Sequence, residues 1–231
     1  DLDHSNASVQ SVTKTWLSWL KSTIGFDGWR YDFVKGYNGK YVGIYNDATS
    51  PSFSVGEYWP TNSFSTSNPN AWRQEIVGWI DATGGKSTVF DFVTKPLLAA
   101  AISNGNYALL KDSDGKPGGT IGWWPACSTT FLDNHDTGPT PYGQGHWSFP
   151  SGSEAVGYAY ILTHPGTPSV FWPHYFNYGT TLQTAIKTMI SIRKAQKITN
   201  ISDVSIQAAD SSKYAAIVNG NTAMKIGPGS W

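Results

Sequence analysis

Strand-like and helical segments alternate through most of this 231-residue chain. The strand-like runs are short and apolar, and the segments between them carry apolar residues at helical spacing. Strict alternation of this kind predicts a parallel sheet whose strands are joined by right-handed crossovers. The expected strands lie within residues 25–33, 52–57, 87–92, 129–133 and 169–172. The expected helices are residues 7–23, 37–49, a helix from Trp72 to Ile80 that Gly84 ends, 95–103, 107–111, 153–163 and 182–193.

The pattern changes beyond Asn200. Short alternating runs follow at residues 204–207, 214–218 and 223–226, separated by turn residues. Alternation with a period of two, interrupted by such turns, predicts antiparallel strands. We therefore expect two domains, a parallel α/β domain in residues 1–200 and the start of an antiparallel β domain in residues 201–231.

The number of strands limits the choice of fold. A closed barrel of eight parallel strands typically takes about 250 residues, so five units are too few to close one. A doubly wound open sheet is the alternative. It is less well supported, because the first strand is not followed by the glycine fingerprint that binds phosphate in such folds.

Three of the expected strands end close to an acidic residue: Asp32, Glu57 and Asp136. The carboxyl ends of parallel barrel strands open onto one face, so acids distant in the sequence can meet there. Two carboxyl groups roughly 5 to 9 Å apart can divide the work of cleaving a glycosidic bond. A lone Asp near a strand end is more often a capping or salt-bridged residue. We interpret Asp133 as a structural hydrogen-bonding residue.

Composition argues against several other classes of function. The formal net charge is +0 and charged residues make up 14% of the chain, so we expect no nucleic-acid or membrane partner. Cys127 is the only cysteine, and the histidines lack the i, i+4 spacing of a helical zinc pair. No Gly-x-Ser-x-Gly motif indicates a serine hydrolase. The aromatic share of 14% is compatible with sugar binding but favours it only weakly.

Several motifs occur together in one order. They are Asp1-Leu-Asp-His4, Gly25-Phe-Asp-Gly-Trp-Arg-Tyr-Asp32, Val55-Gly-Glu57, Phe131-Leu-Asp-Asn-His-Asp136 and Tyr158-Ala-Tyr-Ile-Leu-Thr-His-Pro-Gly-Thr-Pro168. In these motifs the chain resembles the α-amylases of glycoside hydrolase family 13, of the plant type and the bacterial maltooligosaccharide-forming type. The resemblance implies a (β/α)8 TIM barrel of which only the fourth to eighth strand units are present, followed by the start of the C-terminal antiparallel β domain. It also implies hydrolysis of internal α-1,4 bonds in starch, glycogen or related glucans with retention of configuration.

The resemblance assigns the catalytic roles. It makes Asp32 the nucleophile, Glu57 the general acid and base, and Asp136 the third acid, which binds sugar hydroxyls with His135 beside it. Residues two apart on a strand share a face, so we expect the charge of Arg30 to lie beside Asp32 and to favour its ionised form. A non-catalytic glucan-binding homologue, or an inactive fragment of such an enzyme, is the alternative.

Further residues match binding positions of the family. Lys35 and Trp59 correspond to its leaving-group subsites, although packing in the core also explains Trp59. Trp123 and Trp124 resemble a surface platform for starch; the alternative is one ring inside and one outside, as adjacent residues of an extended segment point to opposite faces.

The resemblance also implies a structural Ca²⁺, held by Asp1 and by the backbone carbonyl of Gly36. Calcium takes six to eight oxygens, so most of its ligands would lie outside this sequence. By the same resemblance we expect a secreted, extracellular monomer whose partner is an α-glucan.

Overall fold

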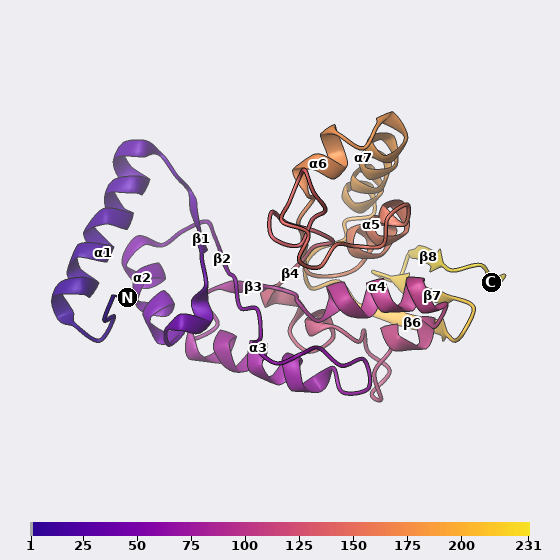
Figure 1. Cartoon of the computed structure of the whole chain (residues 1–231), viewed down its shortest axis with the longest axis horizontal. Helices are drawn as coiled ribbons and strands as arrows, with labels where there is room; N and C mark the ends of the chain where they lie inside the picture. Colours follow the sequence, from indigo (N-terminus) through magenta and orange to yellow (C-terminus); the bar gives the residue numbers. More distant parts are fainter. Residues whose placement is uncertain (1) are drawn as a thin grey trace. The chain divides into compact units, whose positions relative to one another are not determined.

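The structure is a computed structural model that describes residues 2–231, so Asp1 lies outside the described residues (Figure 1). The chain divides into two compact units. The first comprises the chain up to Ser63 together with Ala71–Phe90, and the second comprises Phe64–Asn70 and Asp91–Trp231.

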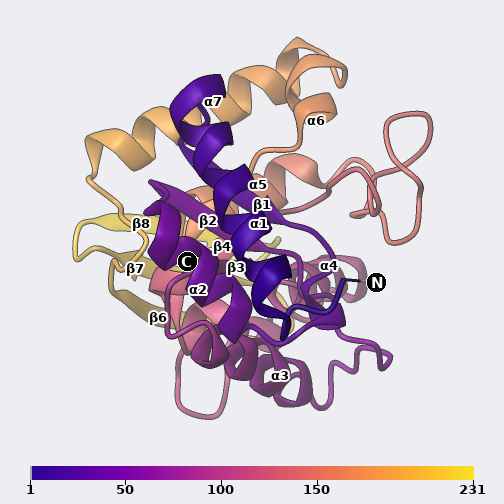
Figure 2. The same ribbon diagram turned by 90° about the vertical axis from the view of Figure 1, so that its left-hand side faces the viewer.

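The first unit is built on three parallel strands, β1 (Gly28–Tyr31), β2 (Phe53–Gly56) and β3 (Thr88–Phe90). In the register of β1 and β2, Arg30 lies opposite Val55 and Tyr31 lies opposite Gly56. The connecting helices are α1 (Ala7–Trp19), α2 (Lys40–Thr49) and α3 (Asn70–Ala82). Helices α1 and α2 pack against each other (Figure 2). Leu17 of α1, Trp29 of β1 and Tyr45 of α2 form a buried core in this unit.

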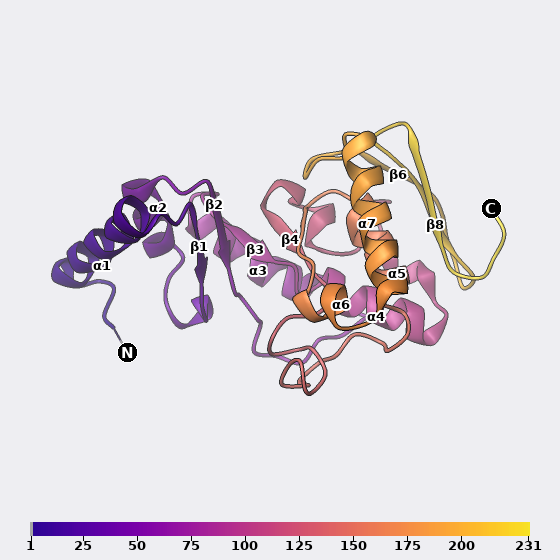
Figure 3. The same ribbon diagram turned by 90° about the horizontal axis from the view of Figure 1, so that it is seen from above.

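The second unit contains the parallel strands β4 (Ser128–Thr130) and β5 (Thr167–Pro168). Its helices are α4 (Thr94–Asn104), α5 (Glu154–Thr163), α6 (Trp172–Phe176) and α7 (Thr180–Ala195). An antiparallel sheet follows in the order β6 (Val204–Ala209), β7 (Tyr214–Val218) and β8 (Thr222–Ile226). Helix α5 packs against α7 and also contacts β8 (Figure 3).

These elements confirm the predicted fold class, because β1 to β3 pair in parallel in the first unit, β4 and β5 pair in parallel in the second, and the last three strands are antiparallel. The strand expected at residues 169–172 is wrong in position, since β5 is confined to Thr167–Pro168 and Trp172 already begins α6. Pro173 explains the early helix: proline is favoured in the first helical turn, where its missing N–H would have no intrahelical partner. The helix expected at residues 7–23 ends at Trp19 and continues as a π-helical segment, Leu20–Ile24.

Among the described residues, no helix is both long and apolar enough to cross a membrane.

The end of α5 is held by Arg193 of α7. The Arg193 guanidinium donates hydrogen bonds to the backbone carbonyls of Leu162 (3.2 Å), His164 (2.6 Å) and Gly166 (2.8 Å). These carbonyls follow one another where α5 passes into β5. One side chain therefore supplies the donors that the end of the helix and the following turn need.

Two histidines of this unit are buried. His164 is fully buried, stacks on Tyr160 at 4.0 Å between ring centroids, and lies 2.8 Å from the Tyr214 hydroxyl of β7 through Nε2. His174 of α6 lies 3.0 Å from the Tyr158 hydroxyl through Nδ1. Burial lowers the pKa of His164 to about 3 and that of His174 to about 4.

We predict that Arg193→Met lowers the free energy of unfolding by about 2 to 4 kcal/mol, because it leaves several carbonyls without a donor. Lys194→Met is the matched control. Lys194 is the exposed neighbour on the same helix, so we expect a change within about 0.5 kcal/mol. Chemical unfolding followed by circular dichroism measures both. Equal effects of the two substitutions would contradict the anchoring role of Arg193.

We also predict that the protein loses stability as the pH falls from about 6.5 toward 4. The native state keeps His164 and His174 neutral, so in this range the unfolded state binds more protons and is stabilised relative to the native state. The expected slope is about 1.4 kcal/mol per pH unit for each histidine. Unfolding at pH 7, 6 and 5 should show a shallower dependence for His174→Gln and an unchanged one for His146→Gln, since His146 is exposed. Parallel curves for the two variants would refute this origin of acid sensitivity.

Candidate active site

Arg30 and Asp32 lie side by side, as the sequence predicted. Arg30 is on β1 and Asp32 directly follows this strand. Arg30 Nη1 lies 2.7 Å from Asp32 Oδ1, and the Asp32 side chain is 74% exposed. The Asp32 carboxylate is therefore both stabilised by a cation and open to a ligand.

Glu57 directly follows β2, at the same position relative to the paired residues Arg30 and Val55 as Asp32 after β1. Its side chain is only 9% exposed, and its Oε1 lies 3.8 Å from Arg30 Nη2. Because both carboxylates contact one planar guanidinium, their nearest oxygens are at most roughly 9 Å apart, a limit that is compatible with the spacing of glycosidase carboxyl pairs. The in-register pairing of β1 and β2 produces this arrangement.

Phe33 fixes the orientation of the Glu57 carboxylate, which sequence reasoning missed. The backbone N–H of Phe33 donates a hydrogen bond of 3.1 Å to Glu57 Oε2, and Val34 donates another to the Glu57 carbonyl. Phe33 has φ +46°, a left-handed conformation that is uncommon for a bulky residue. Local strain of this kind clusters at functional sites. No sequence signal could have revealed it, because Phe has no preference for this conformation.

The other predicted residues of the first unit lie in the loop after β1 and beyond β2. Lys35 is half-buried, with Nζ 5.3 Å from the centroid of the Phe33 ring. Gly36 is exposed and ends a short 3-10 turn, and Trp59 is half-buried. Lys35 and Gly36 border a shallow depression of about 440 Å³ that Tyr58 and Trp79 also line.

Of the two residues expected to bind calcium, only Gly36 lies among the described residues. Asp1, one of the two expected ligands, lies outside them. In residues 2–231 no group of three or more His, Cys, Asp or Glu side chains could hold a metal ion. The Gly36 carbonyl alone does not meet the ligand number that Ca²⁺ requires.

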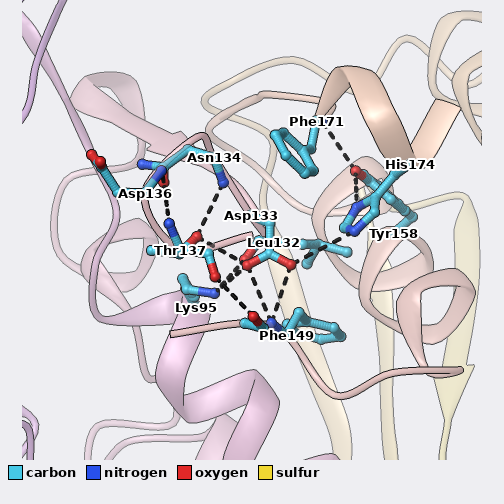
Figure 4. A network of polar contacts seen from close by, with 11 residues as sticks. Lys95, Leu132, Asp133, Asn134, Asp136, Thr137, Phe149, Tyr158, Phe171 and His174 are labelled. Carbon is cyan, nitrogen blue, oxygen red and sulfur yellow. Dashed lines mark hydrogen bonds and ion pairs between the residues drawn. The ribbon is translucent and has the colours of Figure 1, made fainter. Parts of the chain in front are cut away.

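The second unit holds the third acid, Asp136 (Figure 4). Its side chain is 22% exposed, and His135 Nε2 lies 3.2 Å from Asp136 Oδ2. Gln144 Nε2 donates to the other oxygen, Oδ1, at 2.9 Å. The neighbouring His135 was predicted, whereas Gln144 was missed, because only the folded loop brings it back to Asp136.

A hydrogen-bonded turn determines the backbone at Asp136. Asn134 Oδ1 accepts from the N–H groups of Asp136 (3.0 Å) and Thr137 (2.8 Å), and the Asn134 N–H donates to Thr137 Oγ1. Strand β4 ends at Thr130, earlier than the expected residue 133. This turn, rather than the end of the strand, therefore presents Asp136.

Asp133 has the structural role that the sequence indicated. It is 3% exposed, and its carboxylate accepts hydrogen bonds from Lys95 Nζ (2.9 Å), Thr137 Oγ1 (2.9 Å) and the Phe149 N–H. His174 Nε2 lies 3.6 Å from its second oxygen.

Trp123 and Trp124 lie between two short 3-10 turns, Thr120–Gly122 and Pro125–Cys127, and not on a strand. Trp123 is 38% exposed and Trp124 is half-buried. Both residues are thus partly exposed to solvent.

Comparisons with known proteins place these motifs in a family. Residues 195–231 match the model of the alpha-amylase C-terminal beta-sheet domain. The whole chain is 47% identical to Alpha-amylase 3, chloroplastic, of Arabidopsis thaliana, but it spans only 26% of that protein. Alpha-amylase type B isozyme of Hordeum vulgare is 45% identical over 119 residues, which cover 52% of this chain and 74% of the barley protein.

A solved structure shows the same fold. The α-amylase from Malbranchea cinnamomea superposes with a TM-score of 0.68 at 19% identity, over 94% of this chain and 48% of that one. The five parallel strands are thus part of a (β/α)8 TIM barrel, and β6 to β8 begin the antiparallel domain. By sequence and by fold, this chain belongs to the α-amylase family, glycoside hydrolase family 13.

Proposed function

We propose that the protein is a glycoside hydrolase that cleaves internal α-1,4-glucosidic bonds in starch, glycogen or related glucans, with retention of configuration. One observation carries the proposal: the exposed Asp32 and the sheltered Glu57 share the Arg30 guanidinium. Two neighbouring carboxyl groups with different access to solvent suit a nucleophile and a proton donor.

Asp32 attacks the anomeric carbon while Glu57 protonates the departing glycosidic oxygen. The glycosyl group is then bonded to Asp32 Oδ, and the leaving chain carries the proton. In the second step Glu57 takes a proton from water, whose oxygen displaces Asp32 from the sugar. Arg30 stabilises the carboxylate of Asp32 when it is free, and the Phe33 N–H keeps the Glu57 carboxyl oriented throughout.

Asp136 serves as the third acid, binding sugar hydroxyls and favouring the distorted ring, with His135 as a neighbouring donor. The contact between Asp136 and His135 and the solvent exposure of both side chains support this assignment. Lys35 and Trp59 form the leaving-group subsites. Trp123 and Trp124 form a surface platform on which flat sugar faces stack.

The remaining proposals concern the whole protein. A structural Ca²⁺ binds the Gly36 carbonyl and Asp1, with further ligands from outside this sequence. The protein is extracellular and monomeric, and residues 1–200 and 201–231 belong to the catalytic and the C-terminal domain.

We predict that Asp32→Asn lowers the release of reducing sugar from soluble starch by about a thousandfold or more, because the amide cannot form the covalent intermediate. Asp27→Asn is the matched control: this exposed acid precedes the same strand and should leave turnover unchanged. Near-normal turnover of Asp32→Asn would refute the nucleophile assignment. Starch binding without turnover in the wild type would instead favour the non-catalytic homologue.

We predict that Trp123→Ala weakens binding to granular starch severalfold and leaves kcat on a soluble maltooligosaccharide unchanged. Removing one stacking ring costs about 1 kcal/mol. Trp123→Phe keeps a flat ring and should retain most of the binding, as measured by sedimentation with starch granules. Equal granule binding of Trp123→Ala and the wild type would rule out the platform.

A further inference from the structure

Lys95 is a buried cation whose hydrogen bonds end at the loop that carries Asp136. It lies in the first turn of α4 and is 1% exposed. Its Nζ donates to the Leu132 carbonyl (2.5 Å) and to Asp133 Oδ1 (2.9 Å). Figure 4 shows the two acceptors side by side, directly before the Asn134 turn.

A continuous series of hydrogen bonds leads from Lys95 to Asp136. Asp133 Oδ1 accepts from Thr137 Oγ1, and Thr137 Oγ1 accepts from the Asn134 N–H. Asn134 Oδ1 then accepts from the Asp136 N–H. Each step fixes a backbone or side-chain atom of the turn, so a shift of Asp133 would move the turn with it.

Burying the Lys95–Asp133 ion pair costs desolvation free energy, so stability alone does not account for it. Burial lowers the pKa of Lys95, and Asp133 opposes that shift. Buried ion pairs are often no more stabilising than apolar residues of the same volume. A charged pair at the base of an active-site turn is better explained by the geometry that it imposes.

We propose that Lys95, acting through Asp133, is a positioning residue that holds Asp136 in its productive place. This inference rests on the proposed function of Asp136. Lys95 itself does not touch the substrate, since it is enclosed by Leu132, Asp133 and the rings of Phe131 and Phe149.

Protonation of His174 makes the effect of removing Lys95 depend on pH, which a purely structural role of Lys95 would not do. Its Nε2 faces Asp133 Oδ2, its Nδ1 faces Tyr158, and Tyr178 packs on its ring. Burial and the charge of Lys95 both lower the pKa of His174, whereas Asp133 raises it. Without Lys95, His174 should therefore bind a proton more readily and restore a positive partner for Asp133 at acid pH.

The test uses the full-length protein, with soluble starch as the substrate. In Lys95→Met we expect kcat to fall about tenfold to a hundredfold near pH 7, with KM changed by less than about threefold. The ratio of variant to wild-type kcat should rise at least about threefold between pH 7 and pH 5. Adding His174→Gln should abolish this rise. Lys111→Met, an exposed lysine of the same unit, should match the wild type at every pH.

Each outcome decides the inference. An unchanged kcat in Lys95→Met, or a deficit that is the same at all pH values, overturns it. A wild type without turnover overturns the proposed function, and this inference with it; an active wild type beside an equally active Lys95→Met overturns this inference alone.

A second variant covers the case in which Lys95→Met does not fold. Lys95→Met with Asp133→Asn buries no unpaired charge and keeps one oxygen acceptor, which the Thr137 hydroxyl and the Phe149 N–H can share as they share Asp133 Oδ1. We expect it to fold, to lose kcat about tenfold, and to show a loss independent of pH because Asp133 no longer carries a charge. Near-normal kcat of this folded double variant would overturn the inference.

Discussion

The chemistry proposed for this protein depends on one guanidinium that two carboxylates share. Arg30 reaches Asp32 with one nitrogen and Glu57 with another. The parallel register of β1 and β2 makes this possible, because Arg30 and Val55 are paired and each acid lies two residues further along its strand. A change in this register would separate the acids, whatever their identity.

The two carboxylates differ in their surroundings although they share a cation. Asp32 projects into solvent, whereas Glu57 is sheltered and receives the N–H of Phe33. A nucleophile needs access, and a proton donor needs a fixed orientation. The left-handed backbone at Phe33 supplies that orientation, which gives this strained residue a physical purpose.

Asp136 is presented in a different way. Strand β4 ends at Thr130, and an Asn134-centred turn carries the chain to Asp136. The buried Asp133 supports that turn through its bonds to Lys95 and Thr137. The second unit therefore positions its acid through a buried ion pair, whereas the first unit positions its two acids through the register of paired strands.

The sequence by itself determined the fold class and most element positions, because alternation and apolar periodicity are local properties of the chain. Its motifs also singled out Asp32, Glu57 and Asp136, and the period of two on a strand predicted the contact of Arg30 with Asp32. Only the tertiary structure decided the roles of Phe33, Gln144 and Lys95, since their partners lie 24, 8 and 38 residues away and no local pattern encodes such contacts. It also moved the last parallel strand to Thr167–Pro168, because Pro173 begins a helix where apolar residues alone indicated a strand.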